Sequence, residues 1–272
     1  MKIAIQGEPG SFSHEAAMKL VPDGVIVPCS LSADAFVAVE SGAAEAAVIP
    51  IENSLAGSVV EHFDMLLTHD VRVVRETRLH IQHNLIGLSG VALDEIERVF
   101  SHPVALAQCR KFLAAHPRME AAAFYDTAGA VKQLVKLRDR HAAGIASEAA
   151  AEYYGAEILA AGIQDNPENF TRFFLVRRAA EAVSDPEANK ISLAFSVENR
   201  PGSLVAALNE LAAMGTNMTK IESRPVHGKP WEYIFYVDCQ IHSGGEATRA
   251  VEALKPHCAM VKELGRYREA GD

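Results

Sequence analysis

Small and polar residues gather at five places where a predicted strand is followed by a predicted helix. These places are residues 7–14, 50–58, 101–103, 126–129 and 147–148. In an α/β sheet, ligands bind beyond the carboxyl ends of the strands, where loops lead into helix N-termini. The first amides of a helix lack partners within the helix and attract anions. The pattern therefore predicts a cleft for a small, negatively charged molecule.

Each of these places also has a purely structural interpretation. Ser, Thr and Asp in front of a helix are most often N-caps, and each cap stabilises the fold by about 1 kcal/mol without a role in binding. For any one place taken singly the cap is the more common case. The residues alone leave both interpretations open.

Patterns for nucleotide or metal chemistry are absent from the sequence. It contains neither G-x-G-x-x-G nor a Gly-Lys-Ser/Thr phosphate loop. His80 and His83 are three apart in a strand-like segment, so their side chains point to opposite faces. No group of His, Cys and carboxylates has the spacing of ligands. We therefore expect neither a bound nucleotide nor a metal.

The composition is that of a globular protein. Its 272 residues are 49% hydrophobic and 22% charged. The net charge of −9 argues against a nucleic-acid partner. The four cysteines are scattered without a C-x-x-C pair, which indicates reduced thiols in a reducing compartment. Neither a signal-peptide core nor a long apolar run is found, so we expect a cytoplasmic protein without a membrane partner.

Residues 1–178 alternate between short strand-like runs and amphipathic helices, as an α/β sheet with crossovers requires. The predicted strands are 2–6, 46–51, 72–80, 82–88, 98–100, 121–124, 142–146 and 171–177. An apolar stripe that runs from Val59 to Leu67 predicts a helix that packs on the core. Crossovers near 72–82 and 158–168 would divide the region into two lobes around a cleft.

A polar segment at 179–190 is predicted to be a linker to a second domain at 191–268. There Ile191, Leu193 and Phe195 alternate with other residues, as one buried sheet face requires. Helices are predicted at 203–214 and after 245, strands at 218–224, 231–239 and up to 264, and a turn at 227–230. This β-α-β-β-α-β order is ferredoxin-like.

Four of the five places, together with a later segment, resemble the successive motifs of prephenate dehydratases. The segments are Gly7-x-x-Gly10-Ser11-Phe12-Ser13-x-x-Ala16, Pro50-Ile51-Glu52-Asn53-Ser54-x-x-Gly57, Ser101-His102-Pro103-x-x-x-x-Gln108-Cys109, Asp126-Thr127-Ala128 and Asn169-x-Thr171-Arg172-Phe173. They occur in the family's order and cover most of residues 1–178. The resemblance implies a two-lobed catalytic domain similar to type II periplasmic binding proteins.

The second domain resembles the ACT domain with which these enzymes sense phenylalanine. Gly202-Ser203-Leu204-Val205 stands at the family's Gly-Ala-Leu-Val loop, with Ser for Ala. Residues 217–225 follow the family pattern, with Met218 where Leu is commoner. The chain starts directly at the first strand, without the chorismate mutase module of some members, so the resemblance implies a monofunctional enzyme.

Such an enzyme removes CO2 and water from prephenate and leaves phenylpyruvate, a step of L-phenylalanine biosynthesis, without a cofactor. Aromatisation supplies much of the driving force, so the protein must mainly orient the dianion and help hydroxide depart. The resemblance implies a catalytic set of Thr171, Asn53, Ser101 and Gln108. It implies a substrate-binding set of Ser11, Glu52, Ser54, Thr127, Arg172 and Phe173.

Thr171 would donate a hydrogen bond, or relay a proton, to the departing hydroxyl. In a regular strand, Thr171 and Phe173 face one side and Arg172 the other. Arg172 is therefore expected to have a supporting role, whereas a bulge would let both polar groups face the substrate. Glu52 would either orient Asn53 or bind an arginine.

The regulatory ligand needs anchors for a carboxylate and an ammonium group, and an apolar pocket. Amides of Gly202 and Ser203 would take the carboxylate, carbonyls near Asn217 the ammonium, and Leu204 would touch the ring. The rest of the implied phenylalanine site is Glu222, Ser223 and Arg224. Two ACT domains paired edge to edge would bury their open strands, which predicts a homodimer or homotetramer.

Two alternatives remain open. The same fold would also suit arogenate, which has an amino group in place of the keto group of prephenate. A two-lobed binding or sensor protein without catalysis would share the cleft, although the missing export signal weighs against a periplasmic binder.

Overall fold

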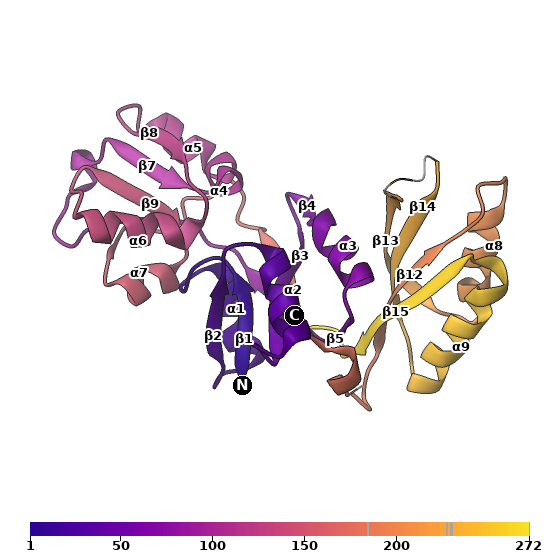
Figure 1. Cartoon of the computed structure of the whole chain (residues 1–272). Coiled ribbons are helices and arrows are strands. Elements are labelled where there is room, and N and C mark those ends of the chain that lie inside the picture. The colour runs from indigo at the N-terminus through magenta and orange to yellow at the C-terminus, as the bar shows by residue number, and fades with distance from the viewer. Residues whose placement is uncertain (184, 227, 229–230, 272) are drawn as a thin grey trace. The chain divides into compact units, whose positions relative to one another are not determined.

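The computed structural model describes residues 1–183, 185–226, 228 and 231–271. The chain folds into two compact units. The first unit contains Met1–Val59 and Thr77–Phe173, and the second contains Val60–Glu76 and Phe174–Asp272. Strands β5 (Val71–His80) and β11 (Phe170–Arg178) each run from one unit into the other (Figure 1).

Three strands of the first unit, β1 (Lys2–Gln6), β2 (Val25–Cys29) and β3 (Ala46–Asn53), run parallel to one another. β1 lies between β2 and β3, with α1 (Phe12–Leu20) and α2 (Ser32–Ser41) as the crossover helices. Ile3, Ala4 and Ile5 are all fully buried, because a parallel sheet is covered on both faces. The sequence analysis missed β2, which contains Pro28 and lies at the edge of the sheet, where a residue without an N–H is tolerated.

The predicted strand at 46–51 continues two residues further, to Asn53, and then turns back. β4 (Gly57–Ser58) pairs antiparallel with the end of β3, Glu52 opposite Ser58. Gly57 has a φ of +85°, which glycine adopts readily. Helix α3 (Val60–Thr68) therefore starts seven residues after Asn53, not directly behind it.

The other sheet of the first unit has the strand order β10-β6-β9-β7-β8. β7 (Arg98–Ser101) runs parallel to β8 (Glu120–Ala123) and β9 (Ala142–Ala146), whereas β6 (Asn84–Gly87) is antiparallel to β9 and to β10 (Glu157–Ala160). The connecting helices are η1 (Leu93–Glu95), α4 (Pro103–Gln108), α5 (Arg110–Ala115), α6 (Thr127–Leu137) and α7 (Glu148–Tyr154). The short strand β10 was not predicted.

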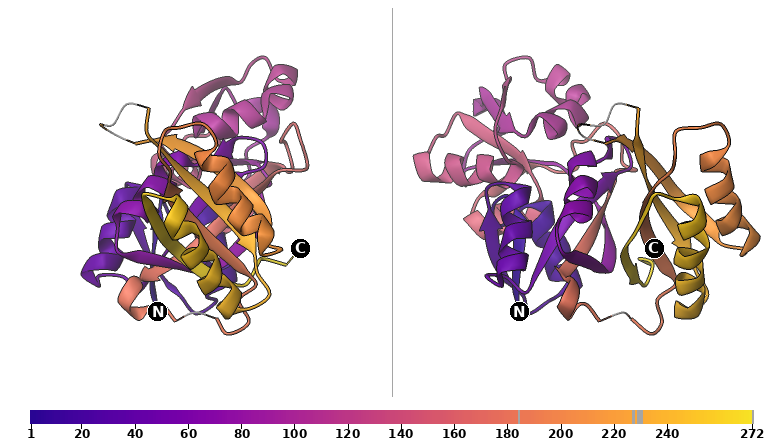
Figure 2. Two further views of the ribbon diagram at one scale, coloured as in Figure 1. Left: turned by 90° about the vertical axis from the view of Figure 1, so that its right-hand side faces the viewer. Right: turned by 45° about the vertical axis from the view of Figure 1, so that its right-hand side comes forward.

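The second unit contains the predicted ferredoxin-like order. It runs β12 (Lys190–Ser196), α8 (Ser203–Ala213), β13 (Asn217–Pro225), β14 (Tyr233–Gln240), α9 (Gly244–Leu254) and β15 (Met260–Tyr267), with η2 (Ala179–Glu181) before it and η3 (Lys255–His257) after α9. Figure 2 shows α8 and α9 on one side of this sheet. Ile191, Leu193 and Phe195 form part of the core beneath these helices, as the alternation predicted. Of the turn expected at 227–230, His227, Lys229 and Pro230 lie outside the described residues.

Helix α3 packs on the opposite face of the same sheet. Val237 of β14 faces the core under α8 and α9, and the adjacent Tyr236 contacts Phe63 of α3, with 5.1 Å between ring centroids. Phe63 and Leu66 are buried, so the predicted apolar stripe is confirmed as core packing. Lys262 Nζ donates to the carbonyls of Leu66 and Leu67 at the C-terminus of α3, at 3.0 and 2.7 Å.

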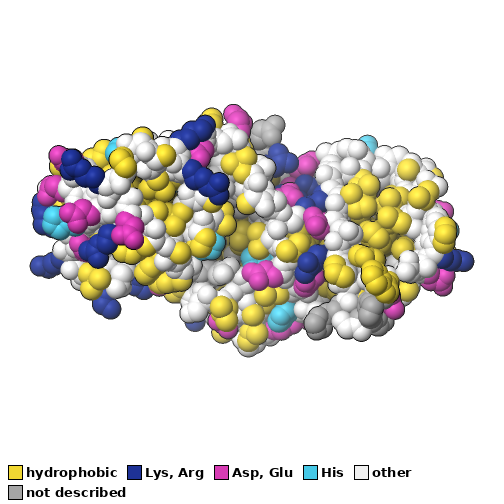
Figure 3. All heavy atoms as spheres, turned by 90° about the horizontal axis from the view of Figure 1, so that it is seen from above, with side chains coloured by type: hydrophobic (Ala, Val, Ile, Leu, Met, Phe, Trp, Pro, Cys, Tyr) yellow, Lys and Arg dark blue, Asp and Glu magenta, His cyan; other side chains and the backbone are white. Residues whose placement is uncertain are grey.

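On the face of the molecule drawn in Figure 3, Lys and Arg side chains are interspersed with Asp and Glu. None of the helices in the described part of the chain is long and apolar enough to cross a membrane. Among the described residues, no group of three or more His, Cys, Asp and Glu side chains could hold a metal ion.

Candidate active site

Asn53 and Thr171, which are 118 positions apart in the chain, form the centre of the candidate site. They lie at the ends of β3 and β11, which are neighbours in the sheet. Asn53 Nδ2 donates to Thr171 Oγ1 at 2.9 Å and to the carbonyl of Phe170 at 3.1 Å. Because Thr171 is only 9% exposed, its hydroxyl is held in a largely desolvated place.

The other end of the Asn53 amide is held by the backbone. Its Oδ1 accepts hydrogen bonds from the amides of Leu55 and Ala56 at 3.0 and 2.8 Å, as in the common turn that Asn forms with its own backbone. Ser54 Oγ accepts from the amide of Phe170 at 2.9 Å and donates to the carbonyl of Glu168 at 3.1 Å. These contacts fix the loop after β3 against the segment that leads into β11.

A chain of amide side chains continues from Asn53 to the second sheet of the first unit. Asn53 Nδ2 donates to Asn169 Oδ1 at 2.7 Å, and Asn169 Nδ2 donates to Gln108 Oε1 at 3.1 Å. Gln108 is the last residue of α4, which starts at Pro103 as predicted. Gln108 Oε1 also lies 2.8 Å from Nε2 of His83. Asn169 is fully buried, so each end of its amide needs a partner.

Arg172 is paired with Glu52. Arg172 Nε lies 2.8 Å from Glu52 Oε1, and the arginine side chain is only 6% exposed. Glu52 and Arg172 contact each other across adjacent strands, as do their neighbours Asn53 and Thr171. Because successive side chains of a strand point to opposite faces, Thr171 and Arg172 face opposite sides of β11. The supporting role of Arg172 stays a prediction.

Other predicted site residues lie outside this cluster. Ser11 is the N-cap of α1, and Thr127 is the first residue of α6. Ser101 is fully buried and donates to the carbonyl of Ile145 at 2.6 Å. Phe173 is 2% exposed and packed in the interior. The structural interpretation as caps thus holds for Ser11, as it does for Asp126 and Ser147.

The loop after β1 contacts α6 and the residues just before it. Glu8 accepts hydrogen bonds from Tyr125 at 3.0 Å and from Lys132 at 2.8 Å. Gly7 has a φ of +95°, and a Cβ there would lie 2.5 Å from Asp126 Oδ2. Burial, together with the negative charge of Glu8, raises the pKa of Asp126 above its ordinary value. A glycine is therefore required where this loop passes the acidic cap of α6.

The sequence analysis missed two members of the cluster. Asn169 stands within the quoted motif but was not assigned a role. His83 was considered only as a metal ligand, together with His80, and its side chain is 3% exposed. Only its contact with Gln108, 25 positions away, distinguishes it, and no local spacing could have shown that contact.

Comparisons with known proteins agree with this fold. The family model described as prephenate dehydratase matches residues 3–181, and that of the ACT domain matches residues 191–255. The chain belongs to the prephenate dehydratase family. It is 39% identical to arogenate dehydratase/prephenate dehydratase 2, chloroplastic, of Arabidopsis thaliana, over 98% of this chain and 72% of that protein.

Two solved structures share the whole fold of this family member. Prephenate dehydratase from Arthrobacter aurescens in complex with L-Phe aligns with a TM-score of 0.89 and 30% identity, over 99% of this chain and 90% of that chain. A protein described as GqqA, a novel type of quorum quenching acylase, aligns with a TM-score of 0.89 and 33% identity, over 98% of both chains. Two proteins that share this fold are thus described with different activities.

The residues that the family resemblance assigns to regulation lie in the second unit. Gly202 precedes α8 with a φ of +85°, and Ser203 is the first residue of that helix. Leu204 packs against the core of the unit. Asn217 Nδ2 donates to Gln240 Oε1 at 2.7 Å.

The later regulatory residues lie along β13. Ser223 stands opposite Phe235 in the ladder, and Glu222 Oε2 lies 3.9 Å from Lys220 Nζ. Arg224 donates to Asp64 of α3 at 2.8 Å. Arg224 thus contacts α3, the helix that follows β3 and β4 in the sequence.

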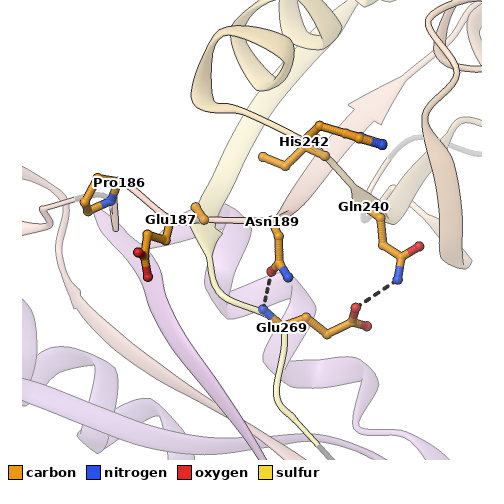
Figure 4. A pocket seen from close by; sticks show the side chains of 8 residues that line it. Pro186, Glu187, Asn189, Gln240, His242 and Glu269 are labelled. Atoms are coloured by element: carbon orange, nitrogen blue, oxygen red, sulfur yellow. Dashed lines mark hydrogen bonds between the residues drawn. The ribbon is translucent and has the colours of Figure 1, made fainter.

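A cavity of about 420 Å³ lies in the second unit, at the end of this ladder where Gln240 of β14 pairs with Asn217 of β13. It is lined by residues 186–189, 240–242 and 269. Glu269 accepts from Gln240 at 2.9 Å and donates its own amide to Asn189 Oδ1 at 2.6 Å (Figure 4). The polar groups drawn there are thus partly engaged with one another. No residue assigned above to the candidate active site or to the phenylalanine site lines this cavity.

Proposed function

We propose that this protein is a prephenate dehydratase that converts prephenate to phenylpyruvate and is inhibited by L-phenylalanine through its ACT domain. The observation that carries the chemistry is the hydrogen bond from Asn53 to Thr171. Since Thr171 Oγ1 accepts from Asn53, the proton of the Thr171 hydroxyl is left for another acceptor. The departing hydroxyl of prephenate is such an acceptor.

In the reaction, the bond between the ring carbon and the hydroxyl breaks and its electron pair leaves with the oxygen. The electrons of the bond to the carboxylate move into the ring, and CO2 departs. Thr171 donates a hydrogen bond to the oxygen as it becomes negative, and the hydroxide takes up a proton to become water. A donor placed where charge develops stabilises the transition state more than the ground state.

The remaining residues of the cluster orient these groups. Glu52 neutralises Arg172, so this pair holds the ends of β3 and β11 together and keeps Asn53 opposite Thr171. We propose that Gln108, at the end of α4, and Ser54, in the loop after β3, contact the substrate. Ser11, Thr127, Ser101 and Phe173 would then act through the shape of the cleft, since three of them are caps or interior residues.

Arogenate is the second candidate substrate. It is favoured by the Arabidopsis relative, whose name includes both activities. The two compounds differ only in the keto or amino group of the side chain. Turnover of both by the purified protein, measured side by side, decides between them: phenylpyruvate absorbs in alkali, whereas arogenate gives phenylalanine.

Acyl-amide hydrolysis is the third candidate, because of the similarity to the structure described as an acylase. A nucleophilic hydroxyl needs a neighbouring base that accepts its proton. Thr171 Oγ1 faces the Nδ2 donor of Asn53, which cannot accept a proton. This geometry favours hydrogen-bond donation over nucleophilic attack. Incubation of the protein with an acylated quorum signal, with release of the acid as the readout, tests the point directly.

The expected result is phenylpyruvate from prephenate, with inhibition by phenylalanine and no release of acid from the acyl amide. Well-folded protein that binds prephenate without turning it over would instead support the sensor alternative. Hydrolysis of the acyl amide alone would overturn the dehydratase.

We also propose the finer points of organisation. A catalytic domain at 1–178, a linker at 179–190 and an ACT domain at 191–268 are supported by the family matches, which leave residues 182–190 between them. The open edge of β13, the first strand in the sheet order, supports a homodimer or homotetramer. Free thiols at all four cysteines, each within the described residues, support a cytoplasmic location. Light scattering tests the assembly.

A further inference from the structure

His83 lies at the end of the amide chain that leads to Thr171. It stands just before β6, is 3% exposed, and contacts the ring of Phe12 edge to face, with 5.5 Å between centroids. Its Nε2 is 2.8 Å from Gln108 Oε1. Its Nδ1 is buried, and among the residues that the structure describes no polar atom forms a hydrogen bond with it.

His83, Gln108, Asn169 and Asn53 form a series of hydrogen-bonded side chains. The direction of each bond in the series follows from the backbone groups that Asn53 contacts. The amides of Leu55 and Ala56 can only donate, so the atom of Asn53 that faces them is the acceptor Oδ1. Nδ2 of Asn53 must then face Asn169 and Thr171. The carbonyl of Phe170, which can only accept, lies on the same side and agrees with this assignment.

The same reasoning applies at each further step. Asn169 must offer Oδ1 to Asn53, which places its Nδ2 against Gln108. Gln108 must therefore offer Oε1, and the same oxygen faces His83. An oxygen that accepts from Asn169 requires a donor from His83 as well. His83 is thus the neutral tautomer with the proton on Nε2, or else the doubly protonated cation.

Burial lowers the pKa of His83 and favours the neutral form, whereas the hydrogen bond to Gln108 acts in the opposite direction and is the smaller effect. A proton on Nδ1 would also find no acceptor there. The buried ring therefore carries one proton, on Nε2, and leaves the lone pair of Nδ1 without a partner.

We propose that His83 is a positioning residue whose Nε2–H holds the Gln108 amide in one orientation. With Oε1 of Gln108 engaged on both sides, its Nε2 amide is the end available to a bound molecule. At the other end of the chain, the Thr171 hydroxyl is likewise left as a donor. The series of hydrogen-bonded side chains therefore presents two donors, Gln108 Nε2 and the Thr171 hydroxyl, and no amide oxygen to an anionic substrate.

A Gln108 amide turned by 180° would place its Nε2 against two donors, His83 and Asn169. It would also turn a carbonyl oxygen towards the anion. The inference rests on the proposed function for its consequence in catalysis, but the tautomer itself is independent of it.

The first test is the tautomer. In wild-type protein labelled with 15N in its histidines, two-dimensional NMR at neutral pH distinguishes a protonated from an unprotonated ring nitrogen. His83→Gln identifies the signals of His83. We expect a protonated Nε2 and an unprotonated Nδ1; a proton on Nδ1, alone or with one on Nε2, would overturn the inference. This test needs no activity, so it stands even if prephenate is not the substrate.

The second test is kinetic and compares His83→Gln, His83→Asn and His83→Leu. The Gln side chain reaches about as far as Nε2 and donates, the Asn side chain is too short, and Leu has no donor. We expect kcat to fall by about 10- to 100-fold in His83→Leu and His83→Asn, by analogy with residues that orient the ligands of a metal through a hydrogen bond. His83→Gln should restore most of it, with KM changed much less than kcat.

The matched controls are His116→Leu and His116→Gln. His116 is also a partly buried histidine of the first unit, and its Nδ1 contacts a backbone carbonyl, that of Phe112, at 2.8 Å. Both controls should keep wild-type kcat. Equal kcat in all three folded His83 variants would contradict the inference, whereas an inactive wild type would refute only the proposed function. If His83→Leu does not fold, His83→Asn and His83→Gln decide.

Discussion

Arg224 of β13 donates to the Asp64 carboxylate of α3 at 2.8 Å, and Tyr236 donates to the same carboxylate at 3.3 Å. The hydrogen bond that Arg224 donates to Asp64 raises the pKa of Arg224 further, so the guanidinium stays charged. Arg224, Tyr236 and Asp64 all belong to the second unit. Helix α3 starts seven residues after Asn53 in the sequence. The contact therefore joins β13 of the proposed sensor to a helix that follows the site residue Asn53 closely along the chain.

We expect Arg224→Ala to weaken inhibition by phenylalanine while the uninhibited rate is kept. The concentration for half-inhibition should rise by about 5-fold or more, the lower end of common coupling energies. Stability should change by less than about 1 kcal/mol, since both side chains are partly exposed. The measurement is a phenylalanine titration of prephenate turnover.

Asp64→Asn distinguishes two explanations for that result. If the contact with α3 transmits the signal, Asp64→Asn weakens inhibition to a similar extent, and the double variant adds little. If Arg224 instead only binds phenylalanine, Asp64→Asn leaves inhibition intact and phenylalanine affinity falls in Arg224→Ala alone. Intact inhibition in both variants would contradict a regulatory role for the pair.

Ser203→Pro removes one amide from the proposed phenylalanine site, together with its 3.3 Å hydrogen bond to the carbonyl of Arg200, without breaking a helix. Ser203 is the first residue of α8, a position where proline is well tolerated. We expect phenylalanine to bind less tightly in calorimetry and the basal rate to persist. Gly244→Pro, at the first residue of α9, is the matched control and should leave the binding isotherm unchanged.

Thr171→Ala should lower kcat for prephenate by about 10²- to 10⁴-fold, the range for positioned proton-transfer groups. KM and the melting temperature should change little, because the substitution removes only a hydroxyl and a methyl group. Thr171→Ser keeps the hydroxyl and should retain much of the rate. Stopped assays of phenylpyruvate measure the effect, and a Thr171→Ala enzyme as fast as the wild type would remove this hydroxyl from the mechanism.

The lowered pKa of His83 predicts a pH dependence of stability. The unfolded chain binds the proton at the ordinary pKa of about 6.5, and the folded protein binds it only at lower pH. The free energy of unfolding therefore falls as the pH drops below about 6.5, by at most about 1.4 kcal/mol per pH unit from this group, until the folded pKa is passed.

His83→Gln removes this group and should flatten the profile. Denaturant titrations of both proteins between pH 7.5 and pH 5 would measure the difference, which also cancels the contributions of carboxylates such as Asp126. Parallel profiles would show that His83 takes up its proton equally in the folded and unfolded states.

Gly265→Ala should destabilise the second unit by about 1–3 kcal/mol, the usual cost of forcing extra atoms into a packed place. A Cβ at Gly265 would lie 2.1 Å from the carbonyl oxygen of Val73, where β15 pairs with β5. Gly245→Ala in α9 is the control, because its Cβ would meet its nearest neighbours only at 3.8 Å. That change should be neutral or stabilising, since alanine favours a helix. Thermal unfolding distinguishes them.

The sequence by itself determined the local structure and the family. Strong periodicity predicted the alternating strands and helices, the ferredoxin-like order of the second unit and the apolar stripe of α3, because these patterns depend on residues near one another in the chain. The edge strands β2 and β10 were missed, since short, partly exposed strands lack a marked alternation. The ordered motifs of residues 7–173 identified the prephenate dehydratase family.

Only the tertiary structure decided which of these polar residues meet. Asn53 and Thr171, Glu52 and Arg172, and His83 and Gln108 are paired by the packing of strands and loops that are 25 to 120 positions apart. The same packing buried Ser101 and Phe173. Hydrogen bonds have direction, and the direction of each amide in the site depends on a partner that the local sequence does not contain.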